Sequence, residues 1–347
     1  METDEKATTV PLNPSEQPAS ARSSGIREVA RHAGVSIATV SRVFNDAGSV
    51  RPGTLDRIMS SASLLSYEPS SLGRNLVRRR SYLIGLIVPN ISVPLYGAMM
   101  HGIEDVLGRH DMKALLASSL DDRATEARVA QALLKHAIDG GIVINSRIGA
   151  ELPGQRRSPW VHITPEISGL EEHRVDLDNE EGGRLAAREF LNSGRRDFGY
   201  VGAPGLESTE RERGYAQELA LAGHSYLAVN GDYSEESGYA AGQVLLTGAL
   251  GAVFVAGDLM AAGVLRALHQ GGCEVPGDVA VIGFDDALIA SLLYPRLSTI
   301  HQPAYQMGAA AAQMTLDLIE RLPVPPVTFK PHLVRRESTS APDPDSS

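Results

Sequence analysis

The sequence predicts a small all-α helix-turn-helix headpiece followed by a larger α/β core of two parallel-sheet subdomains. Three observations lead to this fold class. The run GVSIATVSRVFN (34–45) has the spacing of two helices joined by a tight turn. From residue 82, apolar strand-like runs alternate with amphipathic helical stretches, which is typical of βαβ units. The chain of 347 residues is long enough for two or three compact units.

The two ends of the chain differ in composition from the rest. Residues 1–24 and 338–347 are rich in serine, proline and acidic residues, so we expect two disordered tails. The first of them lacks the apolar segment of a signal peptide, and no run reaches the roughly 20 apolar residues of a membrane helix. The single cysteine, Cys273, excludes an intramolecular disulfide. These features predict a cytoplasmic protein with no membrane partner.

Charge is distributed unevenly along the chain. The whole sequence carries a formal net charge of −10, whereas residues 25–80 hold nine arginines and four acidic residues, a net charge of +5. A small basic unit on an acidic body gives a polyanion one place to bind. On charge alone, a solvated basic face is an equally good interpretation.

Residues 26–45 predict the two helices of the helix-turn-helix unit. Gly34 lies where the chain must turn sharply, and Ser36 can cap the second helix. Residues of the buried type lie on the inner faces: Val29, Ala30, Ala33, Val35, Val40 and Val43. The second helix then turns another set outward, toward a major groove: Ile37, Ala38, Ser41, Arg42 and Asn45. An ordinary helical hairpin is the alternative, and the basic charge argues against it.

A third helix and a basic linker complete the headpiece. The run TLDRIMSSASLLSYEP places Leu55, Ile58, Ala62 and Leu65 on one helical face, which closes a small core within residues 25–69. Residues 70–81 form a helix-compatible hinge that ends in three arginines, Arg78 to Arg80, which we expect to contact phosphate. Leu76 suits a wedge between base pairs in a minor groove, but contact with the next domain explains it equally well.

At this point the sequence resembles the lactose repressor (LacI/GalR) family of bacterial transcription regulators. The motifs VSIATVSRVFN, YEPSSLGRNL, DLDNEEGG, RERGY, VPGDVAVIGFDD and PRLSTIHQP occur in family order. The resemblance implies a repressor whose homodimer binds near-palindromic, double-stranded operator DNA. It also implies control by a small polar effector, a sugar or a related metabolite. The candidate DNA-binding residues are Ser36, Ile37, Ala38, Thr39, Ser41, Arg42, Asn45, Arg74 and Leu76.

Residues 82–337 predict the effector-binding core. Its strand-like runs are more than one sheet would hold, so we expect a first subdomain over 82–161 and a second over about 162–301: YLIGLIV, KALLASS, GGIVIN, DFGYVG, GAVFVA and DVAVIGF. The resemblance implies a periplasmic-binding-protein-like arrangement in which the chain crosses back. Residues of about 304–325 would then be a helix of the first subdomain, and about 326–337 would return to the second.

Polar side chains directly after strands are the candidates for a ligand site, because open α/β sheets bind ligands at the carboxyl ends of their strands. Asn145 follows GGIVI, Asp258 follows VFVAG and Asp285 follows VIGF. Arg211 lies in the loop and helix start after DFGYVG. Asp258 could instead cap the helix that it begins, an interpretation that we favour slightly.

The resemblance assigns effector roles to some of these positions and adds others. It matches Arg211 and Asp285 to the two polar residues that hold the effector in the family. It matches Tyr96 and Tyr233 to positions where an aromatic ring packs against the effector, although Tyr233 could be simple core. Gln302 lies at a family cleft crossing.

Four positions depart from the family pattern. Gly257 replaces a common asparagine and Glu207 a common serine, so the effector need not be an ordinary hexose. In the hinge, Gly73 replaces alanine and Ser70 replaces asparagine. Glycine costs a helix about 1 kcal/mol relative to alanine, which favours a hinge that folds only on the operator.

Two other functional classes share parts of this pattern. A sugar-binding protein of periplasmic type, without a DNA role, would have the same core but no residues 26–80 and a signal peptide. An α/β enzyme would need a motif that this sequence lacks, such as GxxxxGK[ST], GxSxG or a His/Cys cluster. We therefore expect no catalytic residue, no metal and no cofactor.

Overall fold

The computed structural model describes residues 25–45, 50–67, 80–154, 158–167 and 172–339. The chain divides into two compact units, residues 1–79 and 80–347. No helix in the described ranges is long and apolar enough to cross a membrane.

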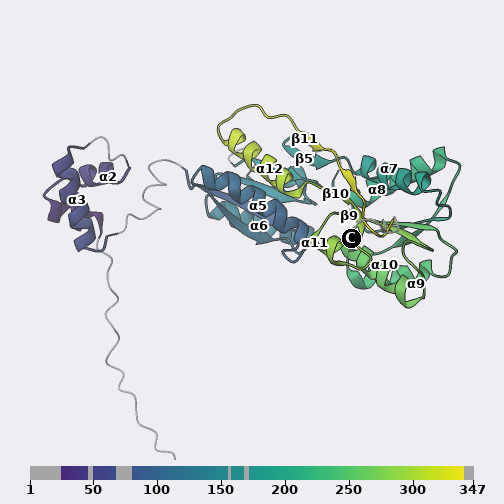
Figure 1. Ribbon diagram of the computed structural model, residues 1–347. Coiled ribbons are helices and arrows are strands. Elements are labelled where there is room, and N and C mark those ends of the chain that lie inside the picture. The colour runs from purple at the N-terminus through teal and green to yellow at the C-terminus, as the bar shows by residue number, and fades with distance from the viewer. Residues whose placement is uncertain (1–24, 46–49, 68–79, 155–157, 168–171, 340–347) are drawn as a thin grey trace, which may run out of the picture. The chain divides into compact units, whose positions relative to one another are not determined.

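The described part of the first unit, called the headpiece, is a three-helix cluster (Figure 1). Its helices are α1 (Ile26–Ala33), α2 (Ile37–Asn45) and α3 (Pro52–Leu64). The helix α1 ends at Gly34, whose φ of 65° confirms the left-handed turn. Val29, Val40 and Ile58 are fully buried, one from each helix. The third helix is therefore confirmed, and so is the inner face of the first two, except that Val35 is only half-buried.

The second unit, called the core, contains two six-stranded sheets, each with helices on both faces (Figure 1). The first sheet has the order β11-β5-β4-β3-β1-β2 and is parallel throughout. Its strands are β1 (Leu83–Val88), β2 (Lys113–Ser118), β3 (Gly140–Ile144), β4 (Trp160–Ile163), β5 (Arg174–Leu177) and β11 (Val327–Phe329). The helices of this subdomain are α5 (Pro94–Arg109), α6 (Arg123–Lys135), the short η2 (Gly149–Glu151) and α12 (Ala304–Ile319).

The second sheet has the order β12-β10-β9-β8-β6-β7, in which only β12 is antiparallel to its neighbour. Its strands are β6 (Phe198–Gly202), β7 (Tyr226–Asn230), β8 (Ala252–Val255), β9 (Ala280–Asp285), β10 (Ser298–His301) and β12 (His332–Val334). Its helices are α7 (Asn179–Asn192), α8 (Leu206–Leu221), α9 (Glu235–Leu245), α10 (Asp258–Gln270) and α11 (Leu288–Leu292). The central strands β6, β8 and β9 are buried along nearly their whole length because helices cover both faces.

Close contact between α7 and α8 depends on glycine. A Cβ atom at Gly183 would lie 2.0 Å from the carbonyl oxygen of Arg211, and one at Gly214 would lie 1.9 Å from that of Glu180. Only glycine permits this approach on both helices. The contact fixes the height of Arg211 above the sheet.

The chain crosses between the two subdomains three times, and the predicted boundaries change accordingly. The expected boundary at residue 161 is wrong, because β4 and β5 both belong to the first sheet. The helix α12 returns to the first subdomain, where it packs on α5. Within the expected second-subdomain segment of about 326–337, β12 pairs with β10, but β11 pairs with β5 in the first sheet. Three-residue strands carry too little periodicity to reveal such a crossing.

The predicted tail at 338–347 begins too early. Ser338 is completely buried, and its Oγ accepts a hydrogen bond from the Ser298 backbone N–H at 2.7 Å. Its carbonyl oxygen accepts one from the N–H of Val281 at 2.9 Å. Ser338 therefore bonds the starts of β9 and β10. Only residues 340–347 of the expected tail lie outside the described ranges.

Candidate functional site

The outward face of α2 is the candidate DNA-reading surface. Ser36 caps the helix, since its Oγ accepts a hydrogen bond from the Thr39 N–H at 3.1 Å and lies 2.8 Å from the Thr39 Oγ1. Ile37 is 45% exposed, although a residue of this type is usually buried. Ala38 and Arg42 are also exposed, while Val40 and Val43 on the opposite face are buried. The helix thus presents a small apolar patch beside a guanidinium group.

The remaining DNA-binding candidates are less exposed or lie outside the described ranges. Thr39 and Ser41 are half-buried. Asn45 is the last residue of α2, and the position of its side chain is not described. Arg74 and Leu76 lie outside the described residues, as do Arg78 and Arg79. Arg80 begins the core, where it forms an ion pair with Glu320 at 2.8 Å. Because this ion pair is exposed, it contributes little to stability and would compete only weakly with a phosphate for Arg80.

In the core, six predicted effector residues lie at the carboxyl ends of strands or in the element that follows. This set, called the inter-subdomain site, comprises Tyr96, Asn145, Arg211, Tyr233, Asp285 and Gln302. Tyr96 and Asn145 belong to the first subdomain, in the first turn of α5 and directly after β3. The other four lie on or beside α8, α9, β9 and β10 of the second. Arg211 lies near the start of α8, within the predicted loop and helix start.

The first subdomain presents Asn145 and Tyr96 together. Asn145 has a φ of 49°, which its amide side chain tolerates better than most. Its Oδ1 accepts a hydrogen bond from the Thr164 Oγ1 at 2.7 Å, and its Nδ2 donates to the Tyr96 hydroxyl at 3.4 Å. Burial raises the pKa of Tyr96, and the carboxylates of Glu207 and Asp285 raise it further. Since both belong to the second subdomain, the two subdomains face each other at Tyr96.

Arg211 is the most constrained side chain of the site, at 2% exposure. Its Nε donates to the Asn179 Oδ1 at 2.9 Å, and its Nη1 donates to the Ala256 carbonyl at 2.6 Å. The guanidinium carbon lies 3.6 Å from the centre of the Phe284 ring, a cation–π contact. Nη2 lies 3.7 Å from the Glu207 Oε2. Protein groups therefore hold all three guanidinium nitrogens, Nη2 only through the longer contact with Glu207.

Asp285 and Tyr233 complete the wall beside Arg211. Asp285 ends β9 with a φ of 111°, a strained value for a residue with a Cβ and one typical of functional sites. Burial raises the pKa of Asp285 to about 7, with Arg211 opposing and Glu207 adding to the shift. A Cβ at Gly257 would lie 3.3 Å from the Tyr233 ring. The glycine at this family asparagine position thus leaves room for the tyrosine.

Asp258, another predicted effector residue, is held by protein partners. Its Oδ1 accepts a hydrogen bond from the Thr299 Oγ1 at 2.6 Å, and its Oδ2 accepts one from the Ala287 backbone N–H at 2.8 Å. The residue is 1% exposed, and it makes no side-chain cap of α10. One carboxylate oxygen thus holds the turn before α11, and the other binds β10. The predicted cap of α10 by Asp258 is therefore wrong, and its effector role stays a prediction.

Gln302 marks the point where the chain leaves β10 to cross between subdomains. The residue is 3% exposed, and its backbone N–H donates to the Asp285 carbonyl at 3.4 Å. Its Oε1 is buried and has no hydrogen-bond partner among the described residues. A buried polar atom without a partner costs about 1–3 kcal/mol, and such atoms are typical of places that a ligand or water completes.

Two carboxylates of the site were not predicted as ligand residues. Glu207 lies in the first turn of α8, and Glu166 follows β4. The Glu166 Oε1 lies 2.9 Å from the position of a Cβ on Gly205, so Glu166 of the first subdomain reaches the start of α8 in the second. Burial raises the pKa of Glu166 to about 7, with Arg147 opposing and Glu207 adding to the shift. Glu166 is a polar residue after a strand, like Asn145 and Asp285. It was not predicted because its strand, WVHI, is too short to recognise from sequence.

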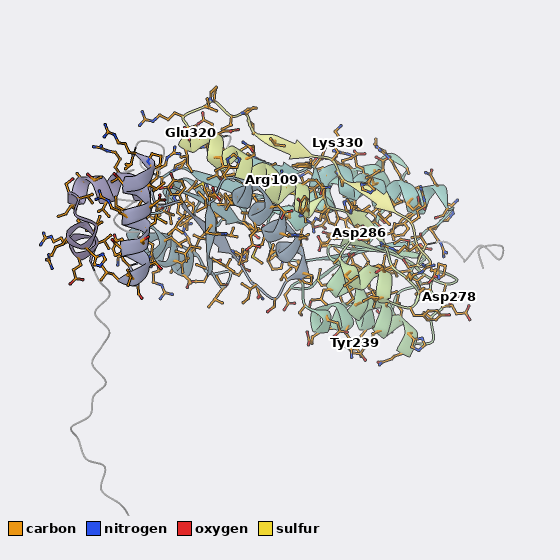
Figure 2. The ribbon with its side chains drawn as sticks, turned by 60° about the vertical axis from the view of Figure 1, so that its left-hand side comes forward. Arg109, Tyr239, Asp278, Asp286, Glu320 and Lys330 are labelled. Atoms are coloured by element: carbon orange, nitrogen blue, oxygen red, sulfur yellow. The ribbon has the colours of Figure 1, made fainter. Side chains whose placement is uncertain are left out.

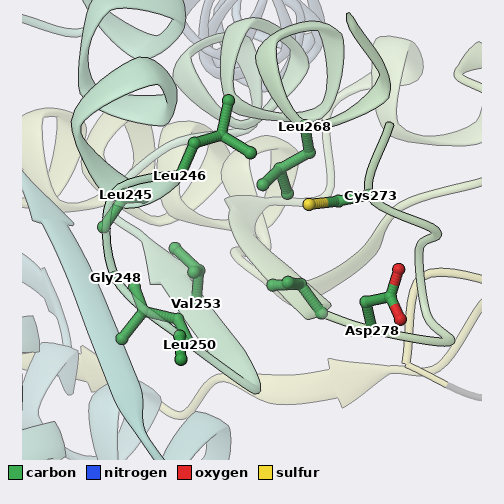
Figure 3. A pocket seen from close by; sticks show the side chains of 10 residues that line it. Leu245, Leu246, Gly248, Leu250, Val253, Leu268, Cys273 and Asp278 are labelled. Carbon is green, nitrogen blue, oxygen red and sulfur yellow. The ribbon is translucent and has the colours of Figure 1, made fainter. Parts of the chain in front are cut away.

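A separate pocket lies away from these residues, among β8, α9 and α10 (Figure 3). Its lining is mostly aliphatic, with Leu245, Leu246, Leu268 and Cys273 among the side chains. The carboxylate of Asp278 at its edge already accepts a hydrogen bond from the Glu274 N–H at 2.9 Å. This lining suits no polyol, so the pocket is not part of the inter-subdomain site.

Comparison with known families matches both units. Residues 25–70 match the bacterial regulatory proteins of the lacI family, and residues 187–339 match the periplasmic binding protein-like domain. The transcriptional regulator GalR of Salmonella typhimurium is 34% identical over 334 residues, which cover 91% of this chain and 96% of GalR. The chain belongs to the LacI family. This LacI-family chain is also 29% identical to the ribose operon repressor of Halalkalibacterium halodurans over 320 residues. The alignment covers 90% of this chain and 96% of that repressor.

Solved structures agree with the LacI-family assignment. A complex of the transcriptional regulator CelR with cellobiose is 30% identical, with a TM-score of 0.69, and covers 91% of this chain and 99% of its own. The lac repressor dimer bound to operator and an anti-inducer has a TM-score of 0.84 at 23% identity, covering 92% of this chain and 99% of its own. The second likeness concerns the fold alone.

Proposed function

We propose that this LacI-family chain is a cytoplasmic, non-enzymatic transcriptional repressor whose homodimer binds a near-palindromic operator under the control of a small polar effector. The observation that carries the proposal is the presence in one chain of an exposed α2 reading face and a fixed, polar inter-subdomain site. A sugar-binding protein without a DNA role would need only the second.

The headpiece would read DNA through α2. Arg42 can donate two parallel hydrogen bonds to the O6 and N7 of a guanine. Ile37 and Ala38 offer only apolar contact, which suits thymine methyl groups. Ser36, Thr39, Ser41, Asn45 and Arg74 would contribute polar contacts to bases or phosphates, and Leu76 would be the minor-groove wedge.

The inter-subdomain site would bind the effector. Arg211 and Asp285 would form paired donor and acceptor contacts with its polar groups, and the rings of Tyr96 and Tyr233 would pack against its apolar faces. Asn145 and Gln302 would complete the polar contacts. Relatives support a sugar-like ligand, since one is named for ribose and another was solved with cellobiose.

Exposed apolar residues around α11 support the homodimer. Leu288 and Leu292 are each 73% exposed, and Tyr294 just beyond them is 96% exposed. They follow, within eight residues, Asp286, which Figure 2 labels. Large apolar side chains that gather on a surface are typical of protein–protein interfaces. A two-fold dimer would present two headpieces to the two halves of an operator.

The test is a selection from a random duplex library with the full chain. We expect enrichment of one near-palindromic sequence, bound at least 1,000-fold more tightly than random DNA. Binding that remains uniform across sequences would contradict the repressor proposal and favour the sugar-binding alternative.

A further inference from the structure

We propose that the effector carries a positive charge, as an amine on a polar, sugar-sized scaffold, and that Glu166 and Glu207 hold the amine between the two subdomains. This inference rests on the proposed effector site and adds the chemical class of its ligand.

The two carboxylates come from opposite sides of the site. Glu166 follows β4 of the first subdomain and Glu207 begins α8 of the second, and each side chain is only 14% exposed. The Glu166 Oε1 lies against Gly205, two residues before Glu207. The Glu207 carboxylate is among the groups that raise the pKa of Glu166. A cation between them would remove this repulsion.

The cations of the site do not balance its carboxylates. Arg147 forms its closer ion pair with Asp121, at 2.9 Å, and lies 3.6 Å from Glu166. With that pair set aside, three carboxyl groups of the site remain, those of Glu166, Glu207 and Asp285. Among the described residues, Arg211 is the one guanidinium that acts on Asp285 and Glu207. With its carboxyls ionised, the site has an excess of negative charge, which a neutral sugar would leave in place.

The hydrogen-bonding groups of the site also favour a ligand that donates. Gln302 contributes a buried amide oxygen with no partner among the described residues, which is a second acceptor besides the carboxylates. An ammonium group has three donors and no acceptor, so it matches this set. The Glu207 carboxylate raises the pKa of Tyr96 and of Tyr233, so both rings lie near it. Aromatic faces attract cations, which also favours a charged ligand.

The pH dependence follows from the groups around the two carboxylates. Glu166 faces Arg147, Asp121 and Glu126 in its own subdomain and Glu207 in the other, and Glu207 also faces Arg211, Asp285, Tyr96 and Tyr233. At acidic pH the Glu166 carboxyl is partly protonated, and a bound cation must displace that proton. The affinity for an amine should therefore rise as pH increases through about 7, while that for a neutral polyol should not.

The experiment compares matched amine and hydroxyl ligands on the full-length chain by isothermal titration calorimetry. The pairs are glucosamine with glucose, galactosamine with galactose, and glucamine with sorbitol, each measured at about pH 6 and about pH 7.5. We expect at least one amine to bind about 10- to 100-fold more tightly than its hydroxyl partner. Glu207→Gln should remove this preference, while Glu218→Gln, further along α8 in an exposed ion pair with Arg188, should retain it.

The possible outcomes separate this inference from the proposed function. A neutral sugar that binds in preference to its amine, with loss of binding in Asp285→Asn, would overturn the charge inference and leave the effector site standing. An amine preference that persists in both Glu207→Gln and Asp285→Asn would place the ligand elsewhere and contradict both. Failure of every amine to bind would overturn the inference.

Discussion

The outer face of α2 and the inter-subdomain site are both arranged for contact, but their side chains are held in opposite ways. On α2, Ile37, Ala38 and Arg42 extend from one helix and are exposed. In the core, Arg211 is 2% exposed, and its Nε and Nη1 are already bound by protein acceptors. A surface that must fit a long partner can order itself on binding, whereas a site for a small ligand has to be fixed beforehand.

The largest expected effect concerns the packing that fixes Arg211. Gly183→Ala should lower the free energy of unfolding of the core by about 3 kcal/mol or more, because a methyl group there would lie 2.0 Å from the Arg211 carbonyl. Urea unfolding followed by circular dichroism would measure it. Gly97→Ala, in the first turns of α5 with open space around its Cβ position, is the control and should be neutral or slightly stabilising. Equal stability of the two variants would contradict the claim that close packing holds the site.

Asp285→Ala tests whether the inter-subdomain site controls the headpiece. It should abolish the effector response and leave effector-free operator affinity close to wild type. A coupling of about 1–3 kcal/mol corresponds to roughly 5- to 150-fold in operator affinity, and operator DNA should change effector affinity by the same factor. Fluorescence anisotropy with the selected operator, with and without effector, measures both. A variant that still responds at the same effector concentration would show that the effector binds elsewhere.

Arg42→Ala tests the exposed half of the comparison. Loss of a two-bond guanine contact should cost about 1–3 kcal/mol at one operator position and leave random-DNA affinity almost unchanged. Arg78→Ala and Arg79→Ala provide the contrast, since loss of a phosphate contact should weaken binding to all sequences and reduce the salt dependence. Equal losses of Arg42→Ala on operator and on random DNA would exclude a base-reading role.

A smaller effect should appear in the pH dependence of core stability. The pKa of Glu166 is raised to about 7 in the folded protein, so the folded state binds a proton that the unfolded state releases at lower pH. Stability from this group is present at acidic pH and is lost as pH rises toward 7, by about 1–2 kcal/mol. Thermal unfolding between about pH 5 and about pH 8 should show this loss in the wild type. The profile of Glu166→Gln should be flatter, and an unchanged profile would mean that Glu166 ionises normally.

The headpiece could be predicted from sequence in more detail than the core because its contacts are local. Gly34, Ser36 and the inner face of α2 lie within one stretch of about 20 residues, and helical spacing alone places them. The polar residues after strong strands, Asn145 and Asp285, were found by the same kind of local rule. Glu166 was missed because β4 has only four residues.

The parts of the core that sequence could not predict depend on contacts between distant segments. Asp258 binds Thr299 and Ala287, which belong to elements that no spacing rule relates to α10. The pairing of β11 with β5 joins residues about 150 positions apart through a strand of three residues. Such pairings are set by the tertiary fold rather than by local pattern.

The crossing of the chain also sets the order in which the protein can fold during synthesis. The first subdomain is not complete until α12 and β11 have been made, about 150 residues after β5. Figure 2 labels Lys330, just beyond the end of β11. Before that point, the side of α5 that carries Gly102 lacks its covering helix, because Gly102 packs directly against the backbone of α12. A ribosome must therefore finish most of the second subdomain before the first can close, and a nascent chain halted before residue 304 leaves an apolar helix face open to chaperones or to aggregation.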